Sequence, residues 1–406
     1  MTTLAELKVA AEQQRLRTLG GVGAKLEERV LKAIDEAATA EPVRPLLGHG
    51  LPAVLAVVEA MRASPLADLV SEAGSVRRRK ETFRDLDIIA TASDAPALVD
   101  YFTTLTWVAE VVAKGGTKAT VVAHDGLRFD LRVVPPESFG NLLQHFTGSA
   151  RHNVALREAA VRRGLSVSEY GIAEAETGEV HSFETEEEVY RFLGYEWIPP
   201  ELRENGGELA AARLEATDGG GLPRLVGASD LRGDLHTHTT WSSDGKNTLA
   251  EMVAGAEALG YEYYAVTDHS HYLREGRLEA QWEEIEALRP QVGLTILRGV
   301  EVNIRVDGTL DMADEDLARL DWVVASVHAA RTKNTTERVI AAMENPYVDC
   351  IGHLTGRKLN VREGAEVDFG AIVLKALETG TLLEINAQPN RLDLSDLHAR
   401  AAVRPA

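Results

Sequence analysis

Residues 233–245, with the sequence GDLHTHTTWSSDG, carry a dense set of potential metal ligands. His236 and His238 alternate, so on a β-strand both imidazoles point to the same face. Asp244 follows after a short polar turn. Two imidazoles and a carboxylate directed at one point suit Zn, Mn or Fe, because neutral nitrogens bind these cations and the carboxylate offsets their charge. This stretch therefore predicts a metal site.

Four further potential ligands each follow an apolar, strand-like run: His269, Glu301, His328 and His353. A single histidine of this kind is more often a hydrogen-bonded core residue. Here the runs alternate with helix-like segments such as 247–260 and 333–344, which is the pattern of a parallel α/β barrel or sheet. Since the carboxyl ends of parallel strands converge on one face, the series predicts one shared metal site.

Residues 74–87, with the sequence GSVRRRKETFRDLD, predict a second site. Asp85 and Asp87 alternate on a strand, and Asp130 offers a third carboxylate from a later one. Three converging carboxylates repel each other unless a cation lies between them, and hard oxygen ligands suit Mg²⁺. Such a site can hold two ions for phosphoryl transfer. The simpler alternative for Asp-x-Asp is the exposed face of an edge strand.

The turn at Gly74-Ser75 adds a potential phosphate site. It could offer backbone N–H groups and a hydroxyl to a triphosphate, and Arg77 and Arg78 add positive charge. This placement, directly before the two aspartates, favours the metal interpretation over the edge-strand alternative.

A glycine-rich segment, 19–25, interrupts a helical pattern over 4–37. A helix, a Gly-x-Gly turn and a second helix resemble a helix-hairpin-helix, which presents backbone N–H groups to a phosphate. A plain connection between two helices with a glycine cap is the alternative.

Hydrophobic patterning predicts the remaining elements as residue ranges. We expect strands at 69–76, 85–91, 117–123 and 127–134, and helices at 51–64, near 96–113 and at 137–164. Residues 205–228, rich in Gly, Ala and Glu, indicate a linker.

Composition narrows the class of protein. The chain has 406 residues, 45% of them hydrophobic, and a formal net charge of −20, which argues against nonspecific electrostatic binding of nucleic acid by the whole molecule. No apolar run reaches the about 18 residues of a membrane span. The first residues lack the features of a signal peptide, and Cys350 is the single cysteine. We therefore expect a cytoplasmic protein without a disulfide and without membrane partners.

Residues 74–87, 128–130 and 146–149 resemble the signatures of family X DNA polymerases, and residues 233–353 resemble a PHP (polymerase and histidinol phosphatase) domain. Both in this order resemble the bacterial and archaeal PolX type. The resemblance implies an α+β polymerase core, with helix-hairpin-helix fingers, a mixed-sheet palm and a thumb, followed by an α/β PHP domain, a distorted and here incomplete (βα)7 barrel. The implied domains are fingers 1–48, palm 49–136, thumb 137–204, linker 205–228 and PHP 229–406.

The resemblance also implies roles for individual residues. Asp85, Asp87 and Asp130 would be catalytic ligands of Mg²⁺ or Mn²⁺, and Asp130 would help activate the primer 3′-hydroxyl. The implied nucleotide-binding residues are Gly74, Ser75, Arg78, Phe146, Gly148 and Asn153. The implied DNA-binding residues are Gly21, Gly23, Lys25 and Arg157. The implied PHP ligands, for Zn²⁺ or Mn²⁺, are His236, His238, Asp244, His269, Glu301, His328 and His353.

The chain departs from the family pattern at several positions. Arg79 and Arg84 stand where the family usually has glycine, and His145 where it usually has tyrosine. We expect the amino-terminal lyase-like domain and a first hairpin to be missing, and with them recognition of a gap 5′-phosphate. We also expect the closing Asp-x-His ligand pair to be missing, since Asp396 and His398 come too soon after Asn386 to replace it.

The resulting hypothesis is a template-directed DNA polymerase that fills short gaps in DNA repair by two-metal nucleotidyl transfer, with a PHP 3′-5′ exonuclease or end-processing domain. Its partners would be gapped or primer-template DNA and dNTPs. Because of Arg79 and Arg84, a metal-dependent DNA phosphoesterase whose inactive polymerase half only docks DNA is the alternative. A noncatalytic module that binds DNA ends is the third hypothesis.

Overall fold

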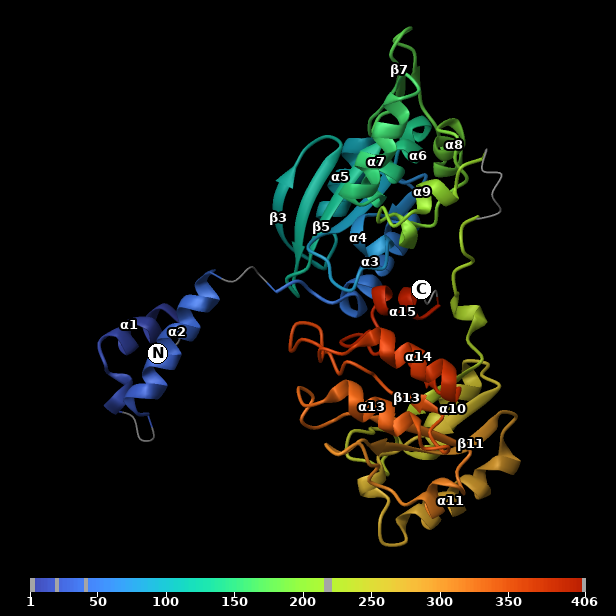
Figure 1. The fold of residues 1–406 in the computed structure, drawn as a ribbon. Coiled ribbons are helices and arrows are strands. Elements are labelled where there is room, and N and C mark those ends of the chain that lie inside the picture. The colour runs from blue at the N-terminus through green and yellow to red at the C-terminus, as the bar shows by residue number, and fades with distance from the viewer. Residues whose placement is uncertain (1–3, 19–21, 40–42, 215–220, 404–406) are drawn as a thin grey trace. The chain divides into compact units, whose positions relative to one another are not determined.

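The structure, a computed structural model, describes residues 4–18, 22–39, 43–214 and 221–403. The chain divides into two units, residues 1–44 and 45–406 (Figure 1). The first unit holds α1 (Leu4–Glu12), the short helix η1 (Leu16–Thr18) and α2 (Ala24–Thr39). The two helices predicted around the glycine-rich segment are therefore present.

A five-stranded mixed sheet forms the core of the predicted palm, in the order β1-β2-β5-β4-β3. Its strands are β1 (Val70–Glu72), β2 (Leu86–Thr91), β3 (Val108–Lys114), β4 (Lys118–Ala123) and β5 (Arg128–Val134). β2 and β5 run parallel, whereas the other pairs are antiparallel. Helices α3 (Leu47–Arg62) and α5 (Ala95–Thr103) pack on this sheet, and the helical turn α4 (Gly74–Arg77) precedes β2 (Figure 1).

Strand alternation sorts the residues of β2 between the two faces of the sheet. Ile88 and Ala90 pack with α3 and α5 in the main palm core, whereas Ile89 packs with residues of α6 (Phe139–Thr147). Because side chains alternate along a strand, Asp87 lies on the same face as Ile89. The polar face of the palm is therefore the face that α6 partly covers.

The thumb follows the palm as a small mixed domain. It comprises η2 (Pro136–Ser138), α6, α7 (Ala150–Val161), β6 (Leu165–Val167), β7 (Ile172–Glu174), β8 (Val180–His181), α8 (Glu186–Phe192) and η3 (Pro200–Leu202). Helix α9 (Glu208–Ala211) lies within the segment predicted as a linker, and Leu209 and Ala212 pack on the core of the thumb. A buried ion-pair cluster joins it to the palm. Arg77 donates to both carboxylate oxygens of Glu186, at 2.9 and 2.8 Å, and Arg203 also donates to Glu186.

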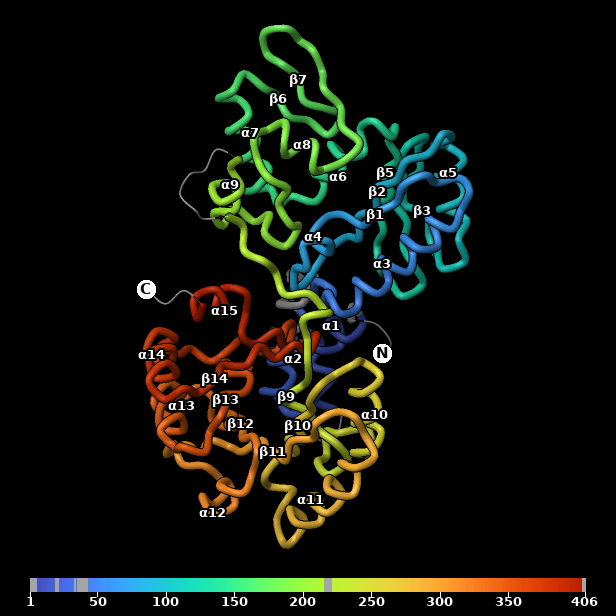
Figure 2. Tube along the Cα trace, turned by 90° about the vertical axis from the view of Figure 1, so that its right-hand side faces the viewer, coloured from blue at the N-terminus to red at the C-terminus, as the bar shows by residue number. Residues whose placement is uncertain are grey.

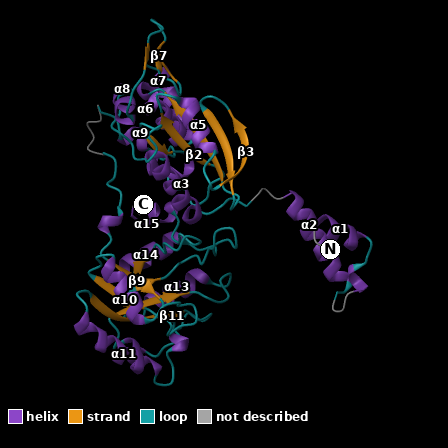
Figure 3. Ribbon diagram, turned by 180° about the vertical axis from the view of Figure 1, so that it is seen from behind, coloured by secondary structure: helices purple, strands orange, loops and turns teal. Residues whose placement is uncertain are grey.

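The PHP half is built on a parallel sheet in the order β14-β13-β12-β11-β10-β9 (Figure 2). The strands are β9 (Gly233–Thr237), β10 (Tyr263–Val266), β11 (Thr295–Asn303), β12 (Trp322–Ser326), β13 (Cys350–Ile351) and β14 (Leu382–Leu383). Figure 3 shows α10 (Leu249–Ala258), α11 (Arg277–Leu288), α13 (Thr335–Met343) and α14 (Phe369–Thr379) around these strands. This half also holds α12 (Asp314–Leu317), α15 (Asp396–Val403) and the short helices η4 (Ala228–Asp230), η5 (Ser270–Tyr272) and η6 (Arg289–Gln291). The predicted alternation of strands and helices is confirmed.

Two expected elements of the palm are wrong in part. The strand expected at 69–76 ends at Glu72, because Gly74 has φ +65 and begins α4. The helix expected near 96–113 ends at Thr103, and β3 follows; its valines favour a strand. None of the helices in the four described ranges is long and apolar enough to cross a membrane.

Replacement of Glu186 by glutamine tests the palm–thumb junction. The side chain of Arg203 is 0% exposed, so Glu186→Gln leaves its charge without a full counter-ion and should lower the free energy of unfolding by about 3–5 kcal/mol at neutral pH. Burial acts to raise the pKa of Glu186, but Arg203 and Arg77 overcome it and lower this pKa from 4.5 to about 2.

Since this pKa is lowered on folding, the stabilisation is present above pH 4.5 and disappears as the pH falls through about 2. As the pH falls from 4.5 to about 2, the free energy of unfolding in urea should therefore decrease less in Glu186→Gln than in the parent. Glu187→Gln, which changes the exposed neighbour, is the matched control and should stay within about 0.5 kcal/mol. Equal stabilities of the two variants would contradict the account.

Candidate active sites

Two of the predicted palm carboxylates face each other across parallel strands. Asp87 on β2 is paired in register with Asp130 on β5, and Asp85 lies directly before Leu86, the first residue of β2. The Gly74-Ser75 turn abuts this pair, since a Cβ atom on Gly74 would lie 2.2 Å from Asp87 Oδ2. Glycine is therefore required at position 74, both for its positive φ and for this close approach.

The palm carboxylates repel one another strongly. Burial, followed by the charges of Asp130 and Asp85, raises the pKa of Asp87 to about 7. Arg84 Nε lies 2.7 Å from Asp85 Oδ2, and Arg128 Nε lies 3.4 Å from Asp85 Oδ1 and 3.8 Å from Asp130 Oδ2. These arginines supply part of the positive charge that the carboxylates need. Oxygen ligands in this number suit a divalent cation of the Mg²⁺ type.

The oxygens of the three palm carboxylates do not all lie close enough together to bind one cation at the same time. Within the described part of the chain, the groups whose ligand atoms all lie within 4.8 Å of one another do not include Asp85, Asp87 and Asp130. Arg128 lies between Asp85 and Asp130, and Thr120 donates a short hydrogen bond to Asp130. A bound cation would replace the arginine contacts.

The arginine predicted to hold the triphosphate is engaged by the thumb. Arg78 Nε donates to Glu204 Oε1 at 2.6 Å, and Arg78 Nη1 donates to the carbonyl oxygen of Thr147 at 2.8 Å. Ser75, on α4, is half-buried beside it. The structure thus places both residues at the palm–thumb junction, next to the carboxylates.

The residues predicted for the nucleotide pocket lie around the corner between α6 and α7. Asn153 Nδ2 donates to the carbonyl oxygens of His145, at 2.7 Å, and Gly148, at 3.2 Å, so this amide holds the corner together. A Cβ atom on Gly148 would lie 2.3 Å from Asn153 Oδ1. The guanidinium of Arg132 lies 4.4 Å from the ring centroid of Phe146. Asn153 therefore has a structural task that its sequence context did not predict.

The predicted DNA-binding residues are described in part. Arg157 is exposed on α7 and donates from Nε to the carbonyl oxygen of Asn153 at 3.2 Å. In the first unit, the Gly23 carbonyl accepts from the backbone of residues 26 and 27, which begins α2, and Lys25 is exposed. Gly21 lies outside the described residues.

The departures from the family pattern have visible local causes or effects. Arg79 has φ +58, a conformation that explains why glycine is usual there. The side chain of Arg84 is 81% exposed and contacts Asp85 directly. His145 Nε2 lies 3.7 Å from Glu169, and burial lowers its pKa.

In the PHP half, a buried carboxylate lies at the centre of the predicted histidines. Oε1 of Glu301 is approached by the Nε2 atoms of His353 at 3.0 Å, His328 at 3.2 Å and His236 at 3.3 Å. Its Oε2 is approached by His269 Nδ1 at 2.9 Å and His238 Nε2 at 3.5 Å. The parallel strands β9 to β13 thus bring six predicted ligands together at their carboxyl ends.

The chemistry of this cluster fits a bound metal. Neither carboxylate oxygen of Glu301 has a hydrogen-bond partner among the described residues, and buried ring nitrogens of His236, His238 and His269 are equally without one. Burial acts to raise the pKa of Glu301, but the surrounding imidazoles hold it well below its usual range. Burial lowers the pKa of His238 to about 4, which keeps this ring in the neutral form that binds cations. A cation would satisfy these atoms together.

The seventh predicted ligand, Asp244, lies at the rim of the cluster. Its side chain is 49% exposed, and its Oδ2 is 3.1 Å from His269 Nε2. Asp396 and His398 do not join the cluster: Asp396 pairs with Lys80 at 3.6 Å, and His398 stacks on Phe369.

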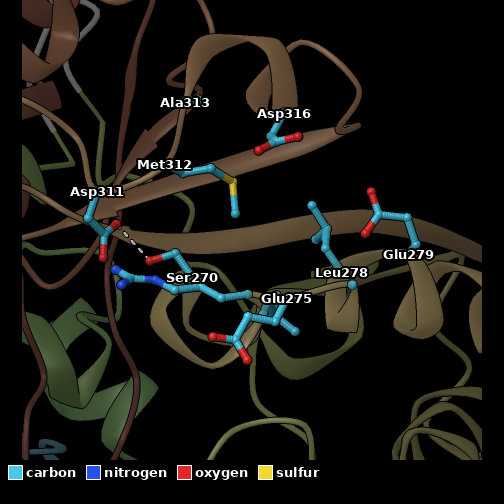
Figure 4. Close-up of a pocket in the computed structure, with 11 residues that line it drawn as sticks. Ser270, Glu275, Leu278, Glu279, Asp311, Met312, Ala313 and Asp316 are labelled. Carbon is cyan, nitrogen blue, oxygen red and sulfur yellow. Dashed lines mark hydrogen bonds between the residues drawn. The ribbon is translucent and has the colours of Figure 1, made fainter.

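A supporting group behind one ligand was missed from the sequence. His328 Nδ1 contacts Asn303 Oδ1 at 2.7 Å, and Asn303 Nδ2 donates to Asp311 at 2.7 Å. Asp311 also accepts from Ser270 at the edge of a cavity of about 320 Å³ (Figure 4). Asp311, which lines this cavity, therefore also holds Asn303, the residue that contacts His328.

Glu384 was also missed as a functional residue, although it directly follows the short apolar strand β14. It accepts from His236 Nδ1 at 2.7 Å. Its position after a strand is the same signal that predicted His353, and this signal could have identified it.

Comparisons with known proteins agree with this arrangement. The family model for the DNA polymerase beta thumb matches residues 142–204, and that for the PHP domain matches residues 234–386. The DNA polymerase/3′-5′ exonuclease PolX of Bacillus subtilis (strain 168) is 40% identical over 411 residues, which cover 98% of this chain and 70% of that protein.

Shorter relatives match the PHP half alone. A probable phosphatase of Acetivibrio thermocellus is 36% identical over 161 residues, and one of Thermoanaerobacter sp. (strain X514) is 34% identical over 167 residues. Each match covers 38% of this chain, and 64% and 63%, respectively, of those proteins. The chain thus spans less than two thirds of either phosphatase.

Glu301→Gln tests the cluster as a metal centre. The variant removes the charge on which five imidazoles converge, so we expect metal retained after dialysis, measured by elemental analysis, to fall at least about tenfold. His124→Ala, at an exposed turn of the palm, is the control and should retain the parent's metal. Unchanged metal content in Glu301→Gln would show that the cluster is not the binding site.

Proposed function

This chain belongs to the PolX family of DNA polymerase/3′-5′ exonucleases, and from this premise we propose how its two halves work. The palm fills short gaps in DNA by template-directed nucleotidyl transfer, and the PHP half trims DNA 3′ ends. One observation carries the polymerase assignment: Asp87 and Asp130 lie in register on parallel strands, directly against the Gly74 turn.

In the palm, Asp85, Asp87 and Asp130 would hold divalent cations, Mg²⁺ or Mn²⁺. Such ions, when bound, clamp the attacking and leaving oxygens of the transferred phosphoryl group. Asp130 would accept the proton of the primer 3′-hydroxyl, and the hydrogen bond from Thr120 would orient its carboxylate. Ser75, the Gly74 backbone and Arg78 bind the triphosphate of the incoming dNTP, with Glu204 and Thr147 fixing Arg78.

The thumb supplies the remaining contacts to the substrate. Phe146 and the α6–α7 corner held by Asn153 shape the nucleotide pocket, and the exposed Arg157 faces the nascent base pair. In the first unit, the turn at Gly23 and Lys25 contacts a DNA strand through its phosphates. The chain's net charge of −20 limits such DNA contacts to these local regions and makes binding sensitive to salt.

In the PHP half, His236, His238, Asp244, His269, Glu301, His328 and His353 would hold the metal, Zn²⁺ or Mn²⁺. Metals held in this way activate water for attack on a phosphodiester. Glu301 supplies the buried negative charge, and the histidines supply imidazole ligands around it. A cytoplasmic location is part of the proposal and is supported by the unpaired, buried Cys350.

One observation favours the alternative function, a phosphoesterase whose polymerase half only docks DNA. Arg84, at a position where the family usually has glycine, forms an ion pair with Asp85. Its guanidinium would therefore compete with a cation for this carboxylate. Its side chain is 81% exposed, however, and exposed ion pairs contribute only about 0–1 kcal/mol. A divalent cation can therefore displace it, and we favour the active polymerase.

Asp130→Asn tests the polymerase assignment. Loss of one ligand and proton acceptor should reduce nucleotide incorporation on a primed template below about one hundredth of the parent rate. Binding of the same DNA, measured by fluorescence anisotropy, should change less than twofold, and removal of 3′ nucleotides by the PHP half should continue.

Asp125→Asn is the matched control, because Asp125 lies on the turn between β4 and β5 and its side chain is 49% exposed. It should incorporate nucleotides at the parent rate. Full incorporation by Asp130→Asn would rule out the proposed mechanism, and absence of incorporation by the parent would favour the phosphoesterase.

A further inference from the structure

Glu384 lies at the carboxyl end of the sheet's outermost strand in the PHP half. Strand β14 pairs with β13 so that Leu383 is opposite Ile351, and Glu384 follows at once. Its backbone is fixed on both sides, because its N–H donates to Ile351 and its carbonyl oxygen accepts from Leu394. The carboxylate therefore projects from a firmly held position next to His353.

The two oxygens of this carboxylate contact two different candidate ligands. Oε1 lies 2.7 Å from Nδ1 of His236, and Oε2 accepts a short hydrogen bond from the backbone N–H of His353. His236 lies on β9, at one edge of the sheet, and His353 follows β13, the strand next to the opposite edge. Glu384 thus bridges two ligands that no local chain segment connects.

The contact to His236 determines which ring nitrogen can bind a cation. A carboxylate at Nδ1 keeps the proton there, so the lone pair of a neutral ring lies on Nε2. This Nε2 lies 3.3 Å from Glu301 and has no hydrogen-bond partner among the described residues. Glu384 therefore directs the free nitrogen of His236 into the cluster.

The contact to His353 fixes a backbone conformation that non-glycine residues rarely adopt. His353 has φ +25, and its N–H is held by Glu384. With the backbone in this position, His353 Nε2 lies 3.0 Å from Glu301 Oε1. The same carboxylate thus places the second ring as well.

We propose that Glu384 is a positioning residue that sets the ring orientation of His236 and the backbone of His353 for metal binding in the PHP half. This proposal rests on the proposed metal centre. Glutamate is required because both of its oxygens accept hydrogen bonds, whereas a glutamine amide has one acceptor and one donor. Glu384→Gln must lose either the contact to His236 Nδ1–H or the contact to the His353 N–H.

The experiment titrates the full chain with Mn²⁺ and measures free Mn²⁺ by electron paramagnetic resonance. The Mn²⁺ binding that is lost in His353→Ala is the part that belongs to the PHP cluster. For this part we expect Glu384→Gln to bind Mn²⁺ about 10–100-fold more weakly than the parent. The matched control is Glu378→Gln, which removes a 70%-exposed carboxylate on α14 and should bind like the parent.

Two further readouts separate positioning from a general loss of structure. The visible absorption spectrum of the Co²⁺-loaded protein reports ligand geometry and should shift in Glu384→Gln, while primer extension by the palm stays within twofold of the parent. Mn²⁺ affinity equal to that of Glu378→Gln would overturn the proposal. Absence of any His353-dependent Mn²⁺ binding in the parent would overturn the metal centre itself, and the proposal with it.

Should Glu384→Gln fail to fold, Glu384→Asp decides the question. It keeps the charge and both acceptors but withdraws them by one methylene from His236. Weaker His353-dependent Mn²⁺ binding by this variant supports the proposal, and parent-like binding overturns it.

Discussion

A buried carboxylate stays ionised only when positive charge or hydrogen-bond donors compensate it, and both halves of this chain are organised around that requirement. Glu301 is surrounded by five imidazoles that approach without hydrogen-bond geometry. Asp87 shares its site with two other aspartates, and its pKa rises to about 7. A divalent cation would compensate the carboxylates of each cluster. The chemistry of these residues therefore agrees with the divalent-metal dependence that the family relationship implies.

Strand geometry brings the ligands together in both halves. In the palm, alternation along β2 and β5 places Asp87 and Asp130 on one face, while their neighbours fill the core beneath. In the PHP half, successive parallel strands end on the same side, so each of these ligands needs only to lie at or just beyond the carboxyl end of its strand. The same geometry explains Glu384, which follows β14. Fold and site therefore share one set of residues, and loops outside the strands add Asp244 at the rim.

Much of this arrangement could be predicted from the sequence, because its signals are local. The alternation of Asp85 and Asp87 and the histidines after apolar runs depend on neighbouring residues. The contacts that escaped prediction join distant parts of the chain. Arg78 pairs with Glu204, 126 residues away, and His236 with Glu384, 148 residues away. The amide of Asn153 likewise holds a corner that forms only when α6 and α7 pack.

The central claim is that the palm is an active, template-directed polymerase. The most direct measurement is primer extension by the unmodified chain on a one-nucleotide-gapped duplex, at low salt, with Mg²⁺ or Mn²⁺ and each dNTP supplied singly. The account predicts incorporation of the complementary nucleotide alone. Incorporation of none of the four dNTPs, or of all four at equal rates, would contradict it.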